Sequence, residues 1–251
     1  MSKLEKEKFI CIDCETTGLD PEKDSIIEVA VTLFTFDEII AEYETLVDPQ
    51  IEIPESSIEI HNITPEMVVG KPKIKAILPE ILELIGTHII IGHGVKFDID
   101  IIAAAAARHD VPCTIQQNKV IDTLRLARLY GDSPSNALAR LGLHFNVESD
   151  GAHRAMNDVR VNIEVFKHLS RQFKFVKDLF KALSKPIQLK TMPLGQHKGR
   201  PFKDIPLPYL RWAANKDFDE DLLFSIRSEI KRRKQGNTFQ QAGNPFADLD
   251  L

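Results

Sequence analysis

The stretch "CIDCETTGLD" (Cys11–Asp20) contains two pairs of side chains that could carry chemistry. Cys11 and Cys14 have the C-x-x-C spacing of redox and zinc sites, and Asp13 and Glu15 interleave with them. The surrounding run "KFICIDCE" is short, apolar and bounded by charges, which predicts a β-strand. Side chains alternate between the faces of a strand, so the two carboxylates share a face and the two sulfurs diverge. Diverging thiols suit neither a disulfide nor a two-thiolate metal clip, so the carboxylates are the expected functional pair.

Length and composition describe an ordinary globular protein. The chain has 251 residues, of which 43% are hydrophobic, enough for one sizeable core and a smaller appended unit. The start "MSKLEKEKF" lacks the apolar segment of a signal peptide, and no apolar run is long enough to cross a bilayer. Three cysteines without a secretory signal argue against a disulfide framework. We therefore expect a cytoplasmic protein with no membrane partner.

The hydrophobic pattern predicts an α/β domain. Two alternating runs, "SIIEVAVTLFTF" and "EIIAEYETLV", flank a short turn and predict an antiparallel hairpin, whereas "DPQIEIPESS" is typical of a loop. Later strands alternate with helical segments, which indicates a mixed sheet. The expected organisation is an α/β domain at 7–175, a linker at 176–189, a small unit at 190–235 and a disordered tail at 236–251.

The charge is distributed unevenly along the chain. Residues 1–180 carry 19 Lys and Arg against 29 Asp and Glu, whereas residues 181–235 carry 13 against 6. A basic segment attached to an acidic body can supply contacts to phosphate groups. A solvated helix face gives the same pattern, and charge alone leaves both interpretations open.

Two further acids follow turns or loops later in the chain. Asp98 lies in "IGHGVKFDID", after a buried strand and a glycine-rich turn, and Asp158 follows His153 by five residues in "GAHRAMNDV". Each acid alone is consistent with the favourable placement of a carboxylate at a helix N-terminus. Hard oxygen ligands that converge on one place would instead bind Mg²⁺ or Mn²⁺. The order of the motifs decides between these interpretations.

That order is D-x-E-T-T-G, then H-x-x-x-F-D, then H-x-x-x-x-D, with "HNIT" at 61–64 and "DTLRLAR" at 122–128. In this order the motifs of residues 7–172 resemble the His-containing branch of the DEDD (DnaQ-like) exonucleases, which includes the epsilon subunit of bacterial DNA polymerase III and ribonuclease T. The resemblance implies a ribonuclease H-like fold, with a five-stranded mixed sheet flanked by helices. It also implies 3′→5′ phosphodiester hydrolysis with two Mg²⁺ or Mn²⁺ ions.

The resemblance also assigns roles to individual residues. It implies a general base, His153, and four metal-binding carboxylates: Asp13, Glu15, Asp98 and Asp158. It implies a site for the nucleic-acid 3′ end formed by Thr16, Thr17, Gly18, Leu19, His61, His93 and Phe97. Leu19 would wedge against the bases. Phe97 is equally consistent with a core residue and His61 with a structural one, and His93 stands where many relatives have Asn. Asp122 is expected to cap a helix.

The expected function is removal of nucleotides from single-stranded or frayed 3′ ends, in DNA proofreading or repair. Trimming of RNA in the manner of ribonuclease T, and a non-catalytic nucleic-acid-binding module, are the alternatives. The tail "FADLDL" loosely resembles peptides that bind sliding clamps, so a polymerase or clamp partner is a further hypothesis.

The small unit resembles a domain that is found alone or fused to such exonucleases. We expect Lys198, Arg200 and the "KRRK" run (Lys231–Lys234) to contact nucleic acid, with a surface-charged helix end as the alternative. Tyr209 and Trp212 are expected in the core of this unit.

Overall fold

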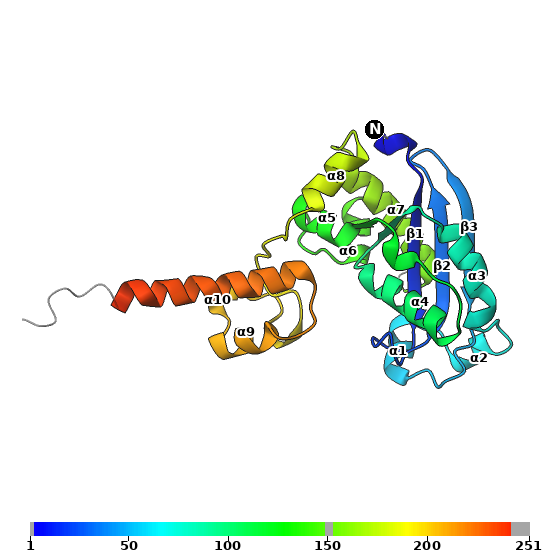
Figure 1. Cartoon of the computed structure of the whole chain (residues 1–251), viewed down its shortest axis with the longest axis horizontal. Helices are drawn as coiled ribbons and strands as arrows, with labels where there is room; N and C mark the ends of the chain where they lie inside the picture. Colours follow the sequence, from blue (N-terminus) through cyan, green and yellow to red (C-terminus); the bar gives the residue numbers. More distant parts are fainter. Residues whose placement is uncertain (1–2, 149–152, 242–251) are drawn as a thin grey trace, which may run out of the picture. The chain divides into compact units, whose positions relative to one another are not determined.

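The structure is a computed structural model that describes residues 3–148 and 153–241 (Figure 1). The chain divides into two compact units, Met1–Leu183 and Ser184–Leu251. Each unit has a hydrophobic core of its own. None of the helices in the described ranges combines the length and apolarity that crossing a bilayer requires.

The first unit is built on the predicted five-stranded mixed sheet, with strand order β3-β2-β1-β4-β5. Strand β2 is antiparallel to both β1 and β3, whereas β4 is parallel to β1 and β5 is parallel to β4. The strands are β1 (Phe9–Thr16), β2 (Ile26–Phe34), β3 (Ile39–Leu46), β4 (Ile89–Gly92) and β5 (Val120–Asp122). Because β1, β4 and β5 run the same way, their C-terminal ends meet at one edge of the sheet.

Helices cover the two faces of this sheet (Figure 1). Helices α3 (Ile74–Ile85) and α4 (Lys96–Arg108) form the layer on one face, and α5 (Thr123–Tyr130), α6 (Leu138–His144), α7 (Ala155–Ser170) and α8 (Val176–Leu183) form the layer on the other. Helices α1 (Glu55–His61) and α2 (Pro65–Val68) pack in a smaller cluster with Ile27, Ile53 and Ile63. Short 3₁₀ turns occur at Leu4–Lys6 and Ile115–Gln117. The fold confirms the predicted ribonuclease H-like class.

Strand β1 divides its side chains between two cores. Phe9 and Cys11 belong to the core shared with α7, whereas Ile10, Ile12 and Cys14 belong to the core shared with α3 and α4. The two sulfurs therefore lie on opposite faces, as the strand period predicts. The same alternation directs the odd-numbered acids of β1 towards the α7 face.

Two segments of the first unit are more regular than the sequence suggested. The predicted loop at 48–57 contains the start of α1, and residues 176–183, which we expected in the linker, form α8. Val176, Leu179 and Leu183 are buried in the core against α7. Their helical spacing places them on one face, so this helix completes the first unit.

The second unit is mainly helical, as predicted. It contains 3₁₀ turns at Gly195–His197 and Phe202–Asp204, followed by α9 (Leu207–Ala213) and α10 (Glu220–Gln241). Its core consists of Met192, Phe202, Ile205, Leu210, Ala213, Leu222 and Ile226. Helix α10 continues into the stretch that was expected to be disordered. The "FADLDL" segment lies outside the described residues.

The prediction of a buried Trp212 is wrong, because its side chain is 52% exposed. Helix α9 buries Leu210 and Ala213, which leaves Trp212 on the outer side. Tyr209 is half-buried and packs against the core.

Candidate active site

The C-terminal edge of the parallel strands brings the predicted acids together. Asp13 and Glu15 lie in the second half of β1, and Asp98 lies in the first turn of α4, directly after β4. The Asp98 carboxylate accepts a hydrogen bond from the backbone N–H of Cys14 at 2.9 Å, which joins α4 to β1. Asp158 lies in the first turn of α7, the helix that packs against the face shared by the β1 acids.

Three of these groups are within reach of a single ion. One side-chain ligand atom from each of Glu15, His153 and Asp158 lies within 4.8 Å of those of the other two. The backbone N–H of His153 donates to the Asp158 carboxylate at 3.1 Å, and this bond keeps the two residues close together. His153 has a left-handed backbone, with φ of 64°, a conformation that costs energy for a residue other than glycine.

The charges in this cluster oppose each other. Burial, followed by the carboxylates of Asp98 and Asp158, holds the pKa of Asp13 well above its ordinary value. Burial and the neighbouring acids raise the pKa of Glu15 to about 7, and burial raises the pKa of Asp98 to about 7. The pKa of Asp158 is also raised, mainly by burial. Divalent cations with oxygen ligands relieve this kind of repulsion, so the donor set fits Mg²⁺ or Mn²⁺.

Glu28 is a functional candidate that our sequence analysis missed. It is the antiparallel register partner of Glu15 and is 1% exposed. Its carboxylate accepts hydrogen bonds from the Arg154 guanidinium, the shortest at 2.7 Å, and from the backbone N–H of Ala155 at 2.9 Å. The pair thus anchors the start of α7 to β2, next to His153. An acid within the apolar run "SIIEVAV" was the available signal, because a buried carboxylate needs a partner.

The loop after β1 is held by its own side chains. The Thr17 hydroxyl donates to the Asp24 carboxylate at 3.0 Å, and a Cβ on Gly18 would come within 2.5 Å of the same carboxylate. The Arg108 guanidinium donates to three backbone carbonyls of the loop, at residues 21, 22 and 24. Thr17 and Gly18 therefore shape the loop, and Leu19, 85% exposed, is a large apolar side chain that it presents to solvent.

The remaining predicted residues have different surroundings. Thr16 is buried, and its hydroxyl donates to the Gly18 carbonyl at 2.7 Å. Phe97 is half-buried against the core shared with α3 and α4. His93 bonds through Nδ1 to the Thr123 hydroxyl at 3.0 Å, and burial lowers its pKa to about 4. It is therefore neutral at physiological pH. Asp122 caps α5 as predicted, accepting from the N–H of Leu124.

His61 is buried beside the acid cluster. Its Nδ1 accepts the backbone N–H of Ile63 at 2.9 Å, so the proton of the neutral ring is on Nε2. Among the described residues this Nε2 has no hydrogen-bond partner. Burial lowers the pKa of His61, and the charges of Glu28 and His153 also act on it, which places the ring near those residues.

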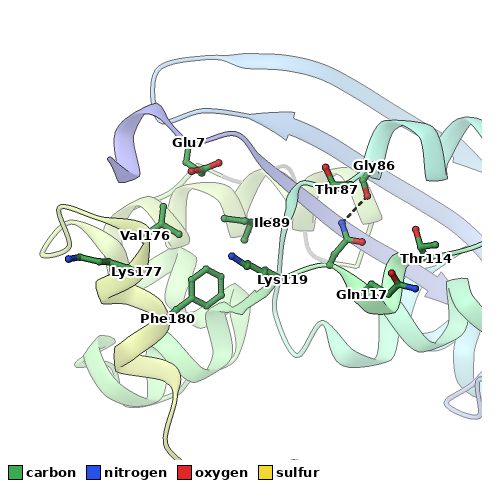
Figure 2. A pocket seen from close by; sticks show the side chains of 11 residues that line it. Glu7, Gly86, Thr87, Ile89, Thr114, Gln117, Lys119, Val176, Lys177 and Phe180 are labelled. Atoms are coloured by element: carbon green, nitrogen blue, oxygen red, sulfur yellow. Dashed lines mark hydrogen bonds between the residues drawn. The ribbon is translucent and has the colours of Figure 1, made fainter. Parts of the chain in front are cut away.

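A separate cavity of about 930 Å³ lies at the other end of the sheet (Figure 2). Glu7, Ile89 and Lys119, which line it, stand at the N-terminal ends of β1, β4 and β5. The Lys119 amine lies 5.9 Å from the centre of the Phe180 ring of α8. This cavity shares none of its lining residues with the acid cluster.

Comparison with known families supports the fold. A family model described as "Exonuclease" matches residues 10–166, which include all five predicted catalytic positions. A second model, described as "Putative quorum-sensing-regulated virulence factor", matches residues 181–227.

Individual relatives agree with the first match. The DNA polymerase III subunit epsilon of Aquifex aeolicus is 35% identical over 159 residues, which cover 63% of this chain and 78% of that protein. The PolC-type DNA polymerase III of Clostridium perfringens is 31% identical over 75% of this chain, but the chain spans only 13% of that polymerase.

Solved structures show the same fold. Exonuclease X in complex with 5′ overhanging duplex DNA superimposes with a TM-score of 0.52 at 24% identity, covering 65% of this chain and 92% of that one. The complex of E. coli exonuclease I with single-stranded DNA gives 0.62 at 22% identity, covering 71% and 43%. With the family model matching well over half of its length, the chain belongs to the exonuclease family that includes the epsilon subunit of DNA polymerase III.

Proposed function

We propose that this chain is a metal-dependent 3′→5′ exonuclease that acts on DNA, with proofreading or repair as its role. The convergence of Asp13, Glu15, Asp98 and Asp158 beside His153 is the observation that carries the proposal. The names of the relatives agree, since they include a replicative polymerase subunit and two exonucleases bound to DNA.

The four carboxylates would hold two Mg²⁺ or Mn²⁺ ions. Such ions stabilise the negative charge that develops on the attacking and leaving oxygens of phosphodiester hydrolysis. The raised pKa values of the acids support this role, because a cation removes the repulsion that causes part of the shift.

His153 would act as the general base. Its imidazole takes a proton from the attacking water while the oxygen of that water bonds to phosphorus. The bond from phosphorus to the 3′ oxygen of the preceding nucleotide breaks, and a nucleoside 5′-monophosphate is released. The Glu28–Arg154 pair serves as the positioning element, because it anchors the chain next to His153.

Two groups are suited to binding the 3′ end. The exposed Leu19 side chain can pack against the terminal base, and its loop is held by Asp24 and Arg108. Among the residues that the structure describes, the Nε2–H of His61 is an unsatisfied donor next to the acid cluster, so we assign it a hydrogen bond to a substrate phosphate oxygen.

A single set of assays tests the proposal. Oligonucleotides labelled at either end, as single-stranded DNA, matched duplex, duplex with a mismatched 3′ end and RNA, are incubated with Mg²⁺, Mn²⁺ or EDTA. We expect stepwise shortening from the 3′ end that requires metal and is fastest on single-stranded and mismatched DNA. Faster shortening of RNA would replace the DNA assignment with the RNA-trimming alternative.

Two neighbouring acids on α4 provide a matched pair of variants. Asp98→Asn and His153→Ala are expected to abolish shortening. Asp100→Asn changes an acid two residues away that pairs with Lys96 at the surface, so it should leave the rate unchanged. Degradation in EDTA, or full activity of Asp98→Asn, would contradict the metal-dependent mechanism.

A further inference from the structure

A row of aromatic side chains lies on the surface of the second unit. The rings of His197 and Tyr209 are 4.5 Å apart between centroids, and those of Tyr209 and Trp212 are 5.3 Å apart. Tyr209 and Trp212 are one helical turn apart on α9, so they share a face of that helix. Trp212 is 52% exposed, a large apolar surface for a unit of this size to leave uncovered.

The loop before α9 is packed against this row. Gly195 and Gly199 both have positive φ, and a Cβ on Gly195 would come within 3.0 Å of the Tyr209 hydroxyl. Backbone hydrogen bonds between Met192 and residues 199 and 200 close the loop into a tight turn. His197 is therefore fixed at the end of the row by the backbone rather than carried on a free loop.

Positive charge accompanies the aromatic row. The Lys216 ammonium lies 4.9 Å from the centre of the Trp212 ring, and an Arg200 nitrogen lies 3.3 Å from Nδ1 of His197. Lys198 follows His197 directly and is exposed. Among the described residues, these three cations have no carboxylate partner, in contrast to Arg232 and Arg233, which both bond to Glu229.

We propose that this surface, formed by His197, Tyr209, Trp212, Lys198, Arg200 and Lys216, binds single-stranded nucleic acid. A base stacks on the exposed Trp212 ring, and the three cations contact the phosphates on either side. Flat aromatic surfaces flanked by cations are the usual means of binding single strands without sequence preference. The flexible Lys216 side chain places its ammonium over one part of the exposed ring and can move to a phosphate when a base stacks there.

Charge favours this ligand over a protein partner with an acidic surface. Residues 184–235 carry 12 Lys and Arg against 6 Asp and Glu, so the unit attracts polyanions. An acidic protein would satisfy the cations, but it would not need the three neighbouring rings. The site would hold a strand independently of the acid cluster, so the proposal goes beyond the hydrolytic function.

The chain offers a specific reporter, because Trp212 is its only tryptophan. The full-length protein is titrated with an oligothymidylate of about 15 nucleotides in EDTA, which prevents hydrolysis. We expect binding to quench the Trp212 emission, since a stacked base is in direct contact with the indole. The acid cluster contains no tryptophan, so quenching reports a base in contact with the second unit.

Variants separate stacking from charge, with affinity read from the anisotropy of a labelled oligothymidylate. Trp212→Leu and Trp212→Ala should both weaken binding roughly 10-fold without changing its salt dependence. Lys216→Gln should reduce the slope of log affinity against log salt by about 0.7. Phe224→Ala removes another exposed aromatic residue of the unit and serves as the control, with unchanged affinity.

Two results would overturn the proposal. One is an unchanged Trp212 emission at saturating oligonucleotide, with metal-dependent hydrolysis intact; this would leave the exonuclease assignment standing and favour a protein ligand for the surface. The other is an equal loss of affinity in Trp212→Leu and Phe224→Ala, which would indicate general disruption of the unit. The two proposals can also fail separately. If the oligonucleotide quenches the Trp212 emission but the protein shows no hydrolytic activity with metal, the result would support this surface and count against the proposed function.

Discussion

Buried carboxylates occur in both units, but their surroundings differ. In the first unit, Asp13, Glu15 and Asp98 are crowded with one another, and their pKa values are raised by burial and mutual repulsion. In the second unit, hydrogen bonds from the guanidinium groups of Arg232 and Arg233 lower the pKa of Glu229 to about 2. A paired acid stabilises its fold, whereas a crowded set costs stability and is typical of functional sites.

Glu28 shows that the difference between crowded and paired acids does not depend on which unit an acid belongs to. It lies opposite Glu15 in the sheet and is the more deeply buried of the two, yet it has a guanidinium partner. The two neighbours therefore divide the roles: Glu28 holds the structure, and Glu15 is available to a metal. Amide substitutions at paired and unpaired acids provide a direct test of this division.

The largest expected effect is on activity. Asp158→Asn should lower the rate of 3′-end shortening by at least about 10³-fold, because it removes a carboxylate that we propose as a ligand of the metal ions, which stabilise the transition state by several kcal/mol. Glu229→Gln should leave that rate unchanged. Single-turnover measurements on labelled DNA check both variants. Comparable rates would contradict the distinction between the crowded acids of the first unit and the paired acid of the second.

A smaller effect is expected on the stability of the first unit. Glu28→Gln should lower the free energy of unfolding by about 2 kcal/mol, less than a fully buried pair would lose because the Arg154 side chain is 46% exposed. Urea denaturation followed by circular dichroism measures the loss. The control is Glu42→Gln, which breaks a surface pair with Arg160 at 3.6 Å and should change the value by less than about 0.5 kcal/mol. Equal losses in the two variants would argue against an anchoring role for Glu28.

The third effect concerns pH. The folded-state pKa of Glu15 is raised to about 7, so the metal-free fold is most stable with this group protonated, below pH 4.5, and loses stability as the pH rises through 7. In EDTA we expect a loss of about 1–2 kcal/mol between pH 5 and pH 8. Saturating Mn²⁺ should remove the loss, because the metal replaces the proton. Asp158→Asn should reduce the slope of the EDTA profile, because after burial the Asp158 carboxylate is the largest influence that raises the pKa of Glu15. A profile unaffected by both Mn²⁺ and the substitution would contradict the account of crowded acids.

The sequence predicted the parts of the site that depend on local periodicity. The period of two along β1 placed Asp13 and Glu15 on one face, and the order of the later motifs pointed to Asp98, His153 and Asp158. The Asp122 cap followed from a single residue at the start of a helix. In these cases the chain within a few residues of each group determines its orientation.

The features that were missed depend on partners distant in sequence. The role of Glu28 comes from Arg154, which is 126 residues away. Helix α9 has only seven residues, so its pattern is compatible with burial of either the Tyr209–Trp212 side or the Leu210–Ala213 side. In the structure the Leu210–Ala213 side is buried, because it packs against α10 and the apolar residues of the loops before α9. Helix α8 likewise depends on the core of the first unit, which a short apolar pattern alone does not reveal.

The smallest expected effect is in the second unit and has the opposite sign with pH. Glu229→Gln should cost about 1 kcal/mol of that unit's stability at pH 7, because Arg232 is 65% exposed and only Arg233 is well enclosed. The pKa of Glu229 is lowered to about 2, so its stabilisation is complete above pH 4.5 and is lost as the pH falls towards 2.

Urea unfolding followed by Trp212 emission reports this unit selectively, since the only tryptophan lies within it. The difference between wild type and variant should shrink as the pH falls from 7 to 2.5, whereas Asp217→Asn, at an exposed position, should match wild type throughout. If the stability difference between wild type and Glu229→Gln instead grows as the pH falls, the two guanidinium groups do not hold Glu229 ionised. Glu229 would then no longer serve as the paired acid in the contrast with the crowded acids.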